Sequence, residues 1–385
     1  HINAVDYEFY MPVATKIIVS PHSFLTELVG IAGALLKITG KPAPTGFDKI
    51  CRDVKITPAH QQIAESLHSK EQTSILLGPQ AMNHPQAASI RMLANLIASL
   101  SQSRFGYLPE AGNSVGAWIS GFVPHRVPGG ASAETSGLNA NEILNKSLKG
   151  YLLLNVEPEI ESASPARSKQ SLINADFVVA LSYFGSENIK EYADVILPVA
   201  PFTETSGTFV NAEGAWQSFS GVVPPAGDAR PAWKVLRVLG NLFGCEGFEY
   251  ITSEDVLNEV KENAGSIIAE NNSEWRSPEL AESKADIVRV AEWQMYAGDS
   301  LQRRAQALQS TFDADVAAIR INKRLAEKIG TADGAQALVT QNGSNVTLPV
   351  IVDDLVADNS VLIHAGLDAS SGLDTSFMPV TIKPV

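Results

Sequence analysis

The chain has 385 residues, of which 45% are hydrophobic and 18% charged, and its formal net charge is −13. The length predicts two or three domains, and the apolar content is sufficient to fold them. The acidic balance argues against nucleic acid or an anionic membrane surface as a partner, because both attract basic proteins. The two cysteines, Cys51 and Cys245, are too few for a disulfide framework or a four-cysteine cluster site.

The first hundred residues predict alternating helices and a strand. Phe24–Leu36 is the longest apolar stretch, and it is shorter than the ~20 residues of a membrane-spanning helix, so we expect a buried helix and no membrane insertion. A helix over Thr57–His68 and a short strand over Ser74–Leu77 should follow. The next helix, capped by Asn83, has an apolar inner face at helical spacing, made of Ile90, Leu93, Ala94, Ile97 and Leu100.

The middle of the chain predicts a parallel sheet. Residues 104–146 are rich in Gly, Pro, Ser and Asn and predict a long connection with little regular structure. Apolar strands are then expected at 151–154, 176–181 and 193–198, with a helix over 164–174 between the first two. Continuous apolar strands between helices indicate a parallel sheet covered on both faces.

The last third predicts a hairpin, helices and a small barrel. A hairpin over Thr203–Trp216 precedes a helix over Trp233–Phe243, and residues 301–329 are expected to be a polar helical stretch. Short, closely spaced strands at 337–340, 346–352 and 361–364, with an Asn-Gly turn after the first, predict a small β-barrel.

These expectations give an α/β region over 1–298 and a β-barrel domain over 299–385. Within the first, residues 51–200 would form a Rossmann-like core of parallel strands, and 201–298 a return segment.

A nucleotide site and a metal site both lack their usual residues. A dinucleotide-binding turn requires several glycines, whereas the turn after the strand at 151–154 has none and instead carries Glu157 and Glu159. Carboxylates at that position would repel a diphosphate. The seven histidines show no metal-ligand spacing, so we expect no metal site.

One alternative is a serine hydrolase. Gly112-Asn113-Ser114-Val115-Gly116 matches the nucleophile-elbow pattern, with His364 as the conceivable base. The elbow requires a buried strand directly before Ser114 and a sustained helix after it. Pro109 and Glu110 precede the motif and Gly121 follows it, so the context is unfavourable.

The densest motif is Ala193–Pro198 followed by Glu204–Gly214. These residues, A-D-V-I-L-P and E-T-S-G-T-F-V-N-A-E-G, resemble the signature of molybdopterin oxidoreductases. Weaker resemblances lie at Gly112–Ala117, Leu152–Pro158 and Arg303–Gln309. The resemblance implies a molybdopterin-oxidoreductase-like α/β fold with a C-terminal barrel of the double-psi type.

Two departures from the family pattern bear on function. Catalytic members have G-E-N-P at their pterin nucleotide site, where this chain has Asn155-Val156-Glu157-Pro158. They often have Arg after the hairpin glutamate, where this chain has Ala215-Trp216-Gln217 after Gly214. The resemblance therefore implies a lost cofactor site, and we assign no catalytic residue. The candidates for a vestigial cofactor cleft are Glu204, Thr208, Asn211 and Glu213.

The opening residues Ile2–Tyr7 and Phe9–Pro12 resemble the G-type subunit of bacterial NADH:quinone oxidoreductase, complex I. That resemblance implies a non-catalytic scaffold for electron transfer from NADH to quinone. The 2Fe–2S and 4Fe–4S clusters would lie in a segment preceding this one, and no cofactor would lie here. The partners would be other peripheral-arm subunits, on the cytoplasmic side of the inner membrane. The second alternative is an active molybdopterin oxidoreductase of the formate dehydrogenase type.

Overall fold

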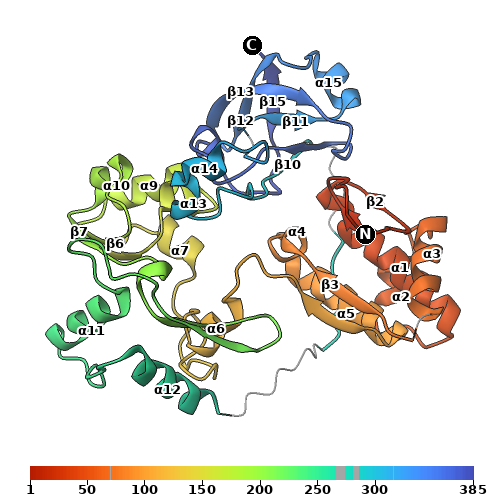
Figure 1. Ribbon diagram of the computed structural model, residues 1–385. Helices are drawn as coiled ribbons and strands as arrows, with labels where there is room; N and C mark the ends of the chain where they lie inside the picture. The colour runs from red at the N-terminus through yellow and green to blue at the C-terminus, as the bar shows by residue number, and fades with distance from the viewer. Residues whose placement is uncertain (70, 266–273, 281–285, 315) are drawn as a thin grey trace. The chain divides into compact units, whose positions relative to one another are not determined.

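Figure 1 shows the computed structural model, which describes residues 1–69, 71–265, 274–280, 286–314 and 316–385. The chain forms two compact units. Unit 1 comprises His1–Leu108, Glu270–Gln294 and Asp315–Val385. Unit 2 comprises Pro109–Ala269 and Met295–Ala314.

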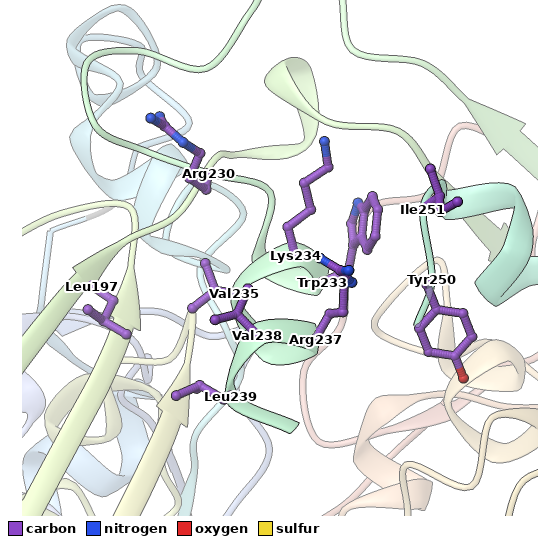
Figure 2. A pocket seen from close by; sticks show the side chains of 10 residues that line it. All are labelled: Leu197, Arg230, Trp233, Lys234, Val235, Arg237, Val238, Leu239, Tyr250 and Ile251. Carbon is purple, nitrogen blue, oxygen red and sulfur yellow. The ribbon is translucent and has the colours of Figure 1, made fainter. Parts of the chain in front are cut away.

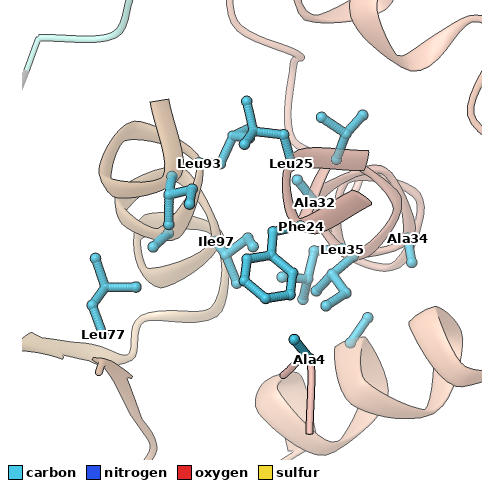
Figure 3. Close-up of a cluster of buried hydrophobic side chains, with 14 of the residues drawn as sticks. Ala4, Phe24, Leu25, Ala32, Ala34, Leu35, Leu77, Leu93 and Ile97 are labelled. Carbon is cyan, nitrogen blue, oxygen red and sulfur yellow. The ribbon is translucent and has the colours of Figure 1, made fainter. Parts of the chain in front are cut away.

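The first part of unit 1 is a layer of helices with two short pairs of parallel strands. The three long helices are α1 (Phe24–Thr39), α3 (Pro58–Ser69) and α5 (Ala87–Ser101). The remaining elements of this layer are β1 (Ile2–Asn3), β2 (Ile17–Ile18), α2 (Phe47–Cys51), β3 (Ser74–Leu77), α4 (Pro79–Met82) and β4 (Arg104–Tyr107). The parallel pairs are β1–β2 and β3–β4. Figure 3 shows the core between α1 and α5, where Leu35 and Leu93 are fully buried.

The expected inner face of α5 is confirmed, because all five of its predicted residues are buried. The strand β3 has the predicted bounds. The strand β4 was not predicted, since its sequence Arg-Phe-Gly-Tyr offers one glycine and no run of apolar residues. It forms through parallel pairing with β3, from Ser74↔Arg104 to Leu77↔Tyr107.

The second part of unit 1 is a six-stranded sheet that closes into a small barrel. Its order is β10 (Val288–Val290), β14 (Ser360–Leu362), β11 (Ile319–Ile321), β13 (Ser344–Val352), β12 (Gln336–Gln341) and β15 (Thr381–Pro384). Closure is achieved because Val288 at one edge bridges Pro379, just before the strand at the other edge. The predicted C-terminal barrel is therefore present.

The turn between β12 and β13 follows the prediction. Asn342 and Gly343 both have positive φ, 48° and 84°, as a two-residue hairpin turn of the primed type requires. The helical stretch expected over 301–329 was wrong. The structure instead has α13 (Ser300–Arg304), α14 (Gln306–Gln309), the strand β11 and α15 (Lys323–Ile329). The first strand of the barrel, β10, also lies before residue 299.

Unit 2 is built on a three-stranded parallel sheet, β5 (Gly150–Leu154), β6 (Phe177–Ser182) and β7 (Val195–Pro198). Its accompanying helices are α8 (Pro158–Glu161), α9 (Pro165–Ile173) and α10 (Glu187–Tyr192). The expectation that both faces are covered was wrong, because Leu152 and Phe177 are 55% and 51% exposed.

The rest of unit 2 surrounds a two-stranded hairpin, β8 (Gly207–Val210) and β9 (Trp216–Phe219). Two short helices, α6 (Ser114–Ile119) and α7 (Ala140–Asn145), occupy the region expected to be irregular. After the hairpin come α11 (Ala232–Leu242) and α12 (Ser253–Ala264). Among the described residues, none of the helices is long and apolar enough to cross a membrane.

Candidate functional site

The hairpin that carries the densest motif is stabilised by its own side chains. Oδ1 of Asn211 accepts hydrogen bonds from the backbone N–H of Glu213 (3.0 Å) and Ala215 (2.9 Å), which closes the turn. The hydroxyls of Thr208 and Ser218 are 2.9 Å apart across the two strands. Asn211 and Thr208 thus shape the hairpin, and Glu213 is exposed at its turn.

Glu204 lies apart from these residues, in a single 3-10 turn (Phe202–Glu204) before the hairpin. Its carboxylate accepts a hydrogen bond from the backbone N–H of Ala226 (2.9 Å). It also lines an open pocket of about 520 Å³, whose lining includes none of the other three cleft candidates. Glu204 therefore lies apart from the three hairpin candidates, and this pocket does not bring the four together.

Asn113 joins the second motif to the first. Its Oδ1 accepts a hydrogen bond from the backbone N–H of Val210 (2.8 Å), which ties the start of α6 to β8. A Cβ at Gly116 would lie 2.0 Å from that same oxygen. The spacing of Asn113 and Gly116 in the sequence therefore has a packing reason, which the sequence pattern alone did not indicate.

The same geometry bears on the serine-hydrolase alternative. Ser114 is the first residue of α6, and its hydroxyl donates to the carbonyl oxygen of Ala111 (3.1 Å). The helix is six residues long and ends at Ile119, and Gly121 then turns the chain with a φ of 74°. His364 belongs to unit 1, where its Nδ1 lies 3.2 Å from the carbonyl oxygen of Glu292. None of these contacts activates the hydroxyl.

The carboxyl edge of the parallel sheet is where α/β proteins bind ligands, outside the ends of the strands. Here β5 ends at Leu154 and the chain turns at Asn155, whose φ of 49° is positive. Its backbone N–H donates to the carbonyl oxygen of Leu181 on β6 (2.8 Å). Asn155 thus occupies a left-handed conformation that glycine adopts most readily, and asparagine more readily than most other residues.

Glu157 follows this turn and is buried, with 2% exposure. Two arginines of α13 hold its carboxylate. Arg303 Nη2 lies 2.6 Å from Oε2, and Arg304 Nη2 lies 2.6 Å from Oε1. Arg304 Nη1 also donates to Oε2 (3.1 Å), so Arg304 binds the carboxylate through both oxygens.

Glu161 completes the network. Its Oε1 pairs with Arg303, and its Oε2 accepts the backbone N–H of Glu157 (3.0 Å) at the start of α8. The guanidinium of Arg304 lies over the ring of Phe184, 4.6 Å from its centroid. Arg303, Arg304 and the backbone N–H of Glu157 therefore all donate hydrogen bonds to the chain's own carboxylates.

The charges of these groups follow from their contacts. Burial by itself would raise the pKa of Glu157, but the hydrogen bonds and charges of Arg304 and Arg303 outweigh it and hold that pKa below its ordinary value. Burial raises the pKa of Glu159, which accepts a hydrogen bond from the hydroxyl of Tyr192 (2.9 Å). Glu157 is therefore an anion at neutral pH, and it is held in place by its ion pairs with Arg303 and Arg304.

This arrangement does not fit a bound pterin diphosphate. A phosphate needs free amides or cations, and here Arg303, Arg304 and the N–H of Glu157 already bind carboxylates. Repulsion of a diphosphate by Glu157 and Glu159 was expected from the sequence, but the arginines that pair with Glu157 were not. In the described part of the chain, no group of three or more His, Cys, Asp or Glu side chains is placed to hold a metal ion.

Comparisons with known proteins connect this geometry to a family. The family model described as molybdopterin oxidoreductase matches residues 49–242. The assimilatory nitrate reductase catalytic subunit of Bacillus subtilis is 30% identical over 194 residues, 44% of this chain and 27% of that protein. The alpha subunit of an F420-dependent formate dehydrogenase of Methanocaldococcus jannaschii is 28% identical over 191 residues, 44% of this chain and 28% of that protein.

Two further relatives cover more of the chain. The G-type subunit of the NADH-quinone oxidoreductase of Mycobacterium bovis is 26% identical over 292 residues, 67% of this chain and 35% of that protein. The solved structure of acetylene hydratase from Pelobacter acetylenicus shares the fold, with a TM-score of 0.63 and 14% identity, over 96% of this chain and 74% of that one.

The matches span only 27%, 28% and 35% of the three curated relatives, whose names give three different activities. The family model nevertheless covers half of the chain, and the expected α/β fold with a C-terminal barrel is present. The chain belongs to the molybdopterin oxidoreductase family.

Proposed function

We propose that this chain is the C-terminal part of a G-type subunit of NADH:quinone oxidoreductase and acts there as a non-catalytic scaffold. It supports electron transfer from NADH to quinone through 2Fe–2S and 4Fe–4S clusters held in a preceding segment of the full-length protein. It docks other peripheral-arm subunits on the cytoplasmic side of the bacterial inner membrane, without inserting into the membrane.

The observation that carries this proposal is the ion-pair network around Glu157 at the carboxyl end of β5. Glu157 is 2% exposed and bound by both Arg303 and Arg304. A family member that used a pterin diphosphate at this edge would leave its cations and amides free for the phosphates. In this chain the fold is retained, and the groups that would bind the anion stabilise the protein itself.

The comparisons support the same assignment through coverage. The match to the G-type subunit extends over 67% of the chain, against 44% for the nitrate reductase and the formate dehydrogenase. The longer match extends the likeness beyond the segment shared with the enzymes.

The second candidate is an active molybdopterin oxidoreductase of the formate dehydrogenase type. It is favoured by the higher identity of the two enzymes, 30% and 28% against 26%. The hairpin motif Glu204–Gly214 is also retained. This candidate requires a pterin site formed by residues other than Glu157 and its partners.

Metal and pterin analysis of the full-length protein separates the two candidates. Inductively coupled plasma mass spectrometry should find iron without stoichiometric molybdenum or tungsten, and oxidative release should yield no fluorescent pterin. Stoichiometric molybdenum or tungsten together with a released pterin would overturn the scaffold proposal and favour the enzyme.

A further inference from the structure

Figure 2 shows a pocket in unit 2 whose lining includes none of Glu157, Glu161, Arg303 and Arg304. It is open and has a volume of about 580 Å³. Its lining comes from the end of β7, from Arg230, from the first turns of α11, and from two residues before α12. In Figure 2, Leu197 lies on one side of the helix, and Tyr250 and Ile251 lie on the other.

Most of the lining is apolar or aromatic. The residues of this kind are Leu197, Trp233, Val235, Val238, Leu239, Tyr250 and Ile251. Two of them face solvent extensively, since Ile251 is 80% and Val238 is 48% exposed. Pockets that bind small molecules have this size and composition, about 300–1,000 Å³ with mostly apolar walls and a few polar groups.

The polar groups of the lining are three cations, Arg230, Lys234 and Arg237. The formal net charge of the chain is −13, yet the lining includes no Asp or Glu. The guanidinium of Arg230 donates to two carbonyl oxygens of its own loop, at 2.7 Å to Ala229 and 3.5 Å to Gly227. Three cationic side chains therefore line one mostly apolar pocket of an acidic chain.

The two cations of α11 have contacts that leave them available to an anion. Nζ of Lys234 lies over the ring of Trp233, 5.3 Å from its centroid. Nε of Arg237 is buried and has no hydrogen-bond partner in the described part of the chain. Because a buried donor without a partner is costly, the guanidinium gains most from an acceptor supplied by a ligand.

We propose that this pocket binds an amphiphilic anion, a carboxylate or phosphate head group carried on an apolar body. The apolar body packs between α11 and Ile251 and covers the exposed side chains there. The head group pairs with Lys234 and Arg237, with Arg230 adding positive potential. The proposed site is independent of the scaffold role, because its lining includes none of Glu157, Glu161, Arg303 and Arg304.

Isothermal titration of the purified full chain tests the proposal with four dissolved probes, and the two amphiphilic anions are kept below their micelle-forming concentrations. The probes are decanoate, decyl phosphate, decanol and inorganic phosphate. We expect both amphiphilic anions to bind one per chain, and decanol and inorganic phosphate each to bind at least about tenfold more weakly. Comparing the two anions shows which head group the site prefers.

Two variants localise the site. Arg237→Gln and Lys234→Gln should each weaken decanoate or decyl phosphate binding about tenfold or more, because each removes a charged hydrogen-bond donor. Lys190→Gln is the matched control, since Lys190 forms an exposed ion pair with Glu187 on α10, outside the pocket. Circular dichroism confirms folding, and Lys234, which is exposed, remains testable if Arg237→Gln fails to fold.

Three results would overturn the proposal. The first is that decanol binds as tightly as decanoate, which would show that the site is an apolar patch without a role for the cations. The second is that Arg237→Gln and Lys234→Gln both bind decanoate and decyl phosphate as tightly as the wild-type chain does. The third such result is that none of the four probes binds, which would indicate that this face contacts a protein partner instead.

Discussion

Gly116 has no room for a side chain, because a Cβ there would lie 2.0 Å from Oδ1 of Asn113. That oxygen accepts the hydrogen bond from Val210 that ties α6 to the hairpin. The glycine is thus explained by packing at one residue, and no catalytic role is needed for the motif around Ser114.

The variant Gly116→Ala should lower the free energy of unfolding of unit 2 by about 1–3 kcal/mol, through overpacking and the lost hydrogen bond to Val210. Urea denaturation followed by circular dichroism measures the change. Gly112→Ala is the control in the same motif, since its Cβ would make only ordinary contact, 4.0 Å from Phe209. Equal effects of the two variants would contradict the packing explanation.

Glu157 is the residue that fills the expected place of a phosphate. Replacing it by Gln leaves Arg303 and Arg304 without their shared anion. Arg303 is 11% exposed and Arg304 is 32% exposed. We expect Glu157→Gln to cost about 3 kcal/mol at neutral pH, the lower end for a broken buried pair. Glu187→Gln, at the exposed pair with Lys190, should cost about 0–1 kcal/mol.

The difference in the free energy of unfolding between the wild-type chain and Glu157→Gln should depend on pH. The pKa of Glu157 is lowered in the folded state, so its contribution to stability is full above the ordinary glutamate pKa and is lost as the pH falls through the lowered value. The gap between the wild-type chain and Glu157→Gln should therefore be large at pH 7 and shrink as the pH falls below the ordinary glutamate pKa of 4.5. A gap that stays constant from neutral to acidic pH would contradict the ion-pair account.

At the scale of elements, α1 and α3 meet through a glycine and a histidine. His60 on α3 is 1% exposed, and its Nε2 lies 2.7 Å from Oε2 of Glu27 on α1. A Cβ at Gly30 would lie 2.3 Å from the His60 ring. The imidazole therefore fills the space that the missing side chain leaves on α1.

A double-mutant cycle tests this contact between the two helices. Gly30→Ala alone should destabilise unit 1 by about 1–3 kcal/mol, because the helices must separate or the imidazole must move. In a His60→Ala background the same change should be neutral or stabilising, since the space is free and Ala favours a helix by about 1 kcal/mol over Gly. Equal costs in both backgrounds, measured by thermal or urea unfolding, would show that the two residues do not interact.

The elements that the sequence predicted share a strong local pattern. The helix α5 repeats apolar residues at helical spacing, and the turn at Asn342-Gly343 has its own turn chemistry. The strands β4 and β11 were missed because Arg104 and Arg320 leave them without the continuous apolar run that marks β3. Such strands form through pairing with a distant partner, which local periodicity does not report.

At the scale of the whole molecule, the family motifs allowed the α/β fold and the C-terminal barrel to be predicted. The division into units could not be predicted, because Met295–Ala314, which contains α13 and α14, belongs to the same unit as Pro109–Ala269. The contact between Arg303 and Glu157 joins positions 146 apart in sequence. The sequence showed that Asn155 stands where the family's nucleotide turn has glycine. The pairing of Glu157 with Arg303 and Arg304 became visible only in the structure.

If the scaffold proposal holds, the chain's own carboxylates occupy the place of a bound phosphate at the carboxyl end of β5. Isothermal titration with pyrophosphate tests it most directly, comparing the wild-type chain with the double variant Glu157→Gln, Glu161→Gln. We predict no binding to the wild type, and binding to the variant, whose Arg303 and Arg304 are released from their carboxylates. Pyrophosphate binding to the wild-type chain that weakens when Arg303 or Arg304 is replaced would contradict the claim.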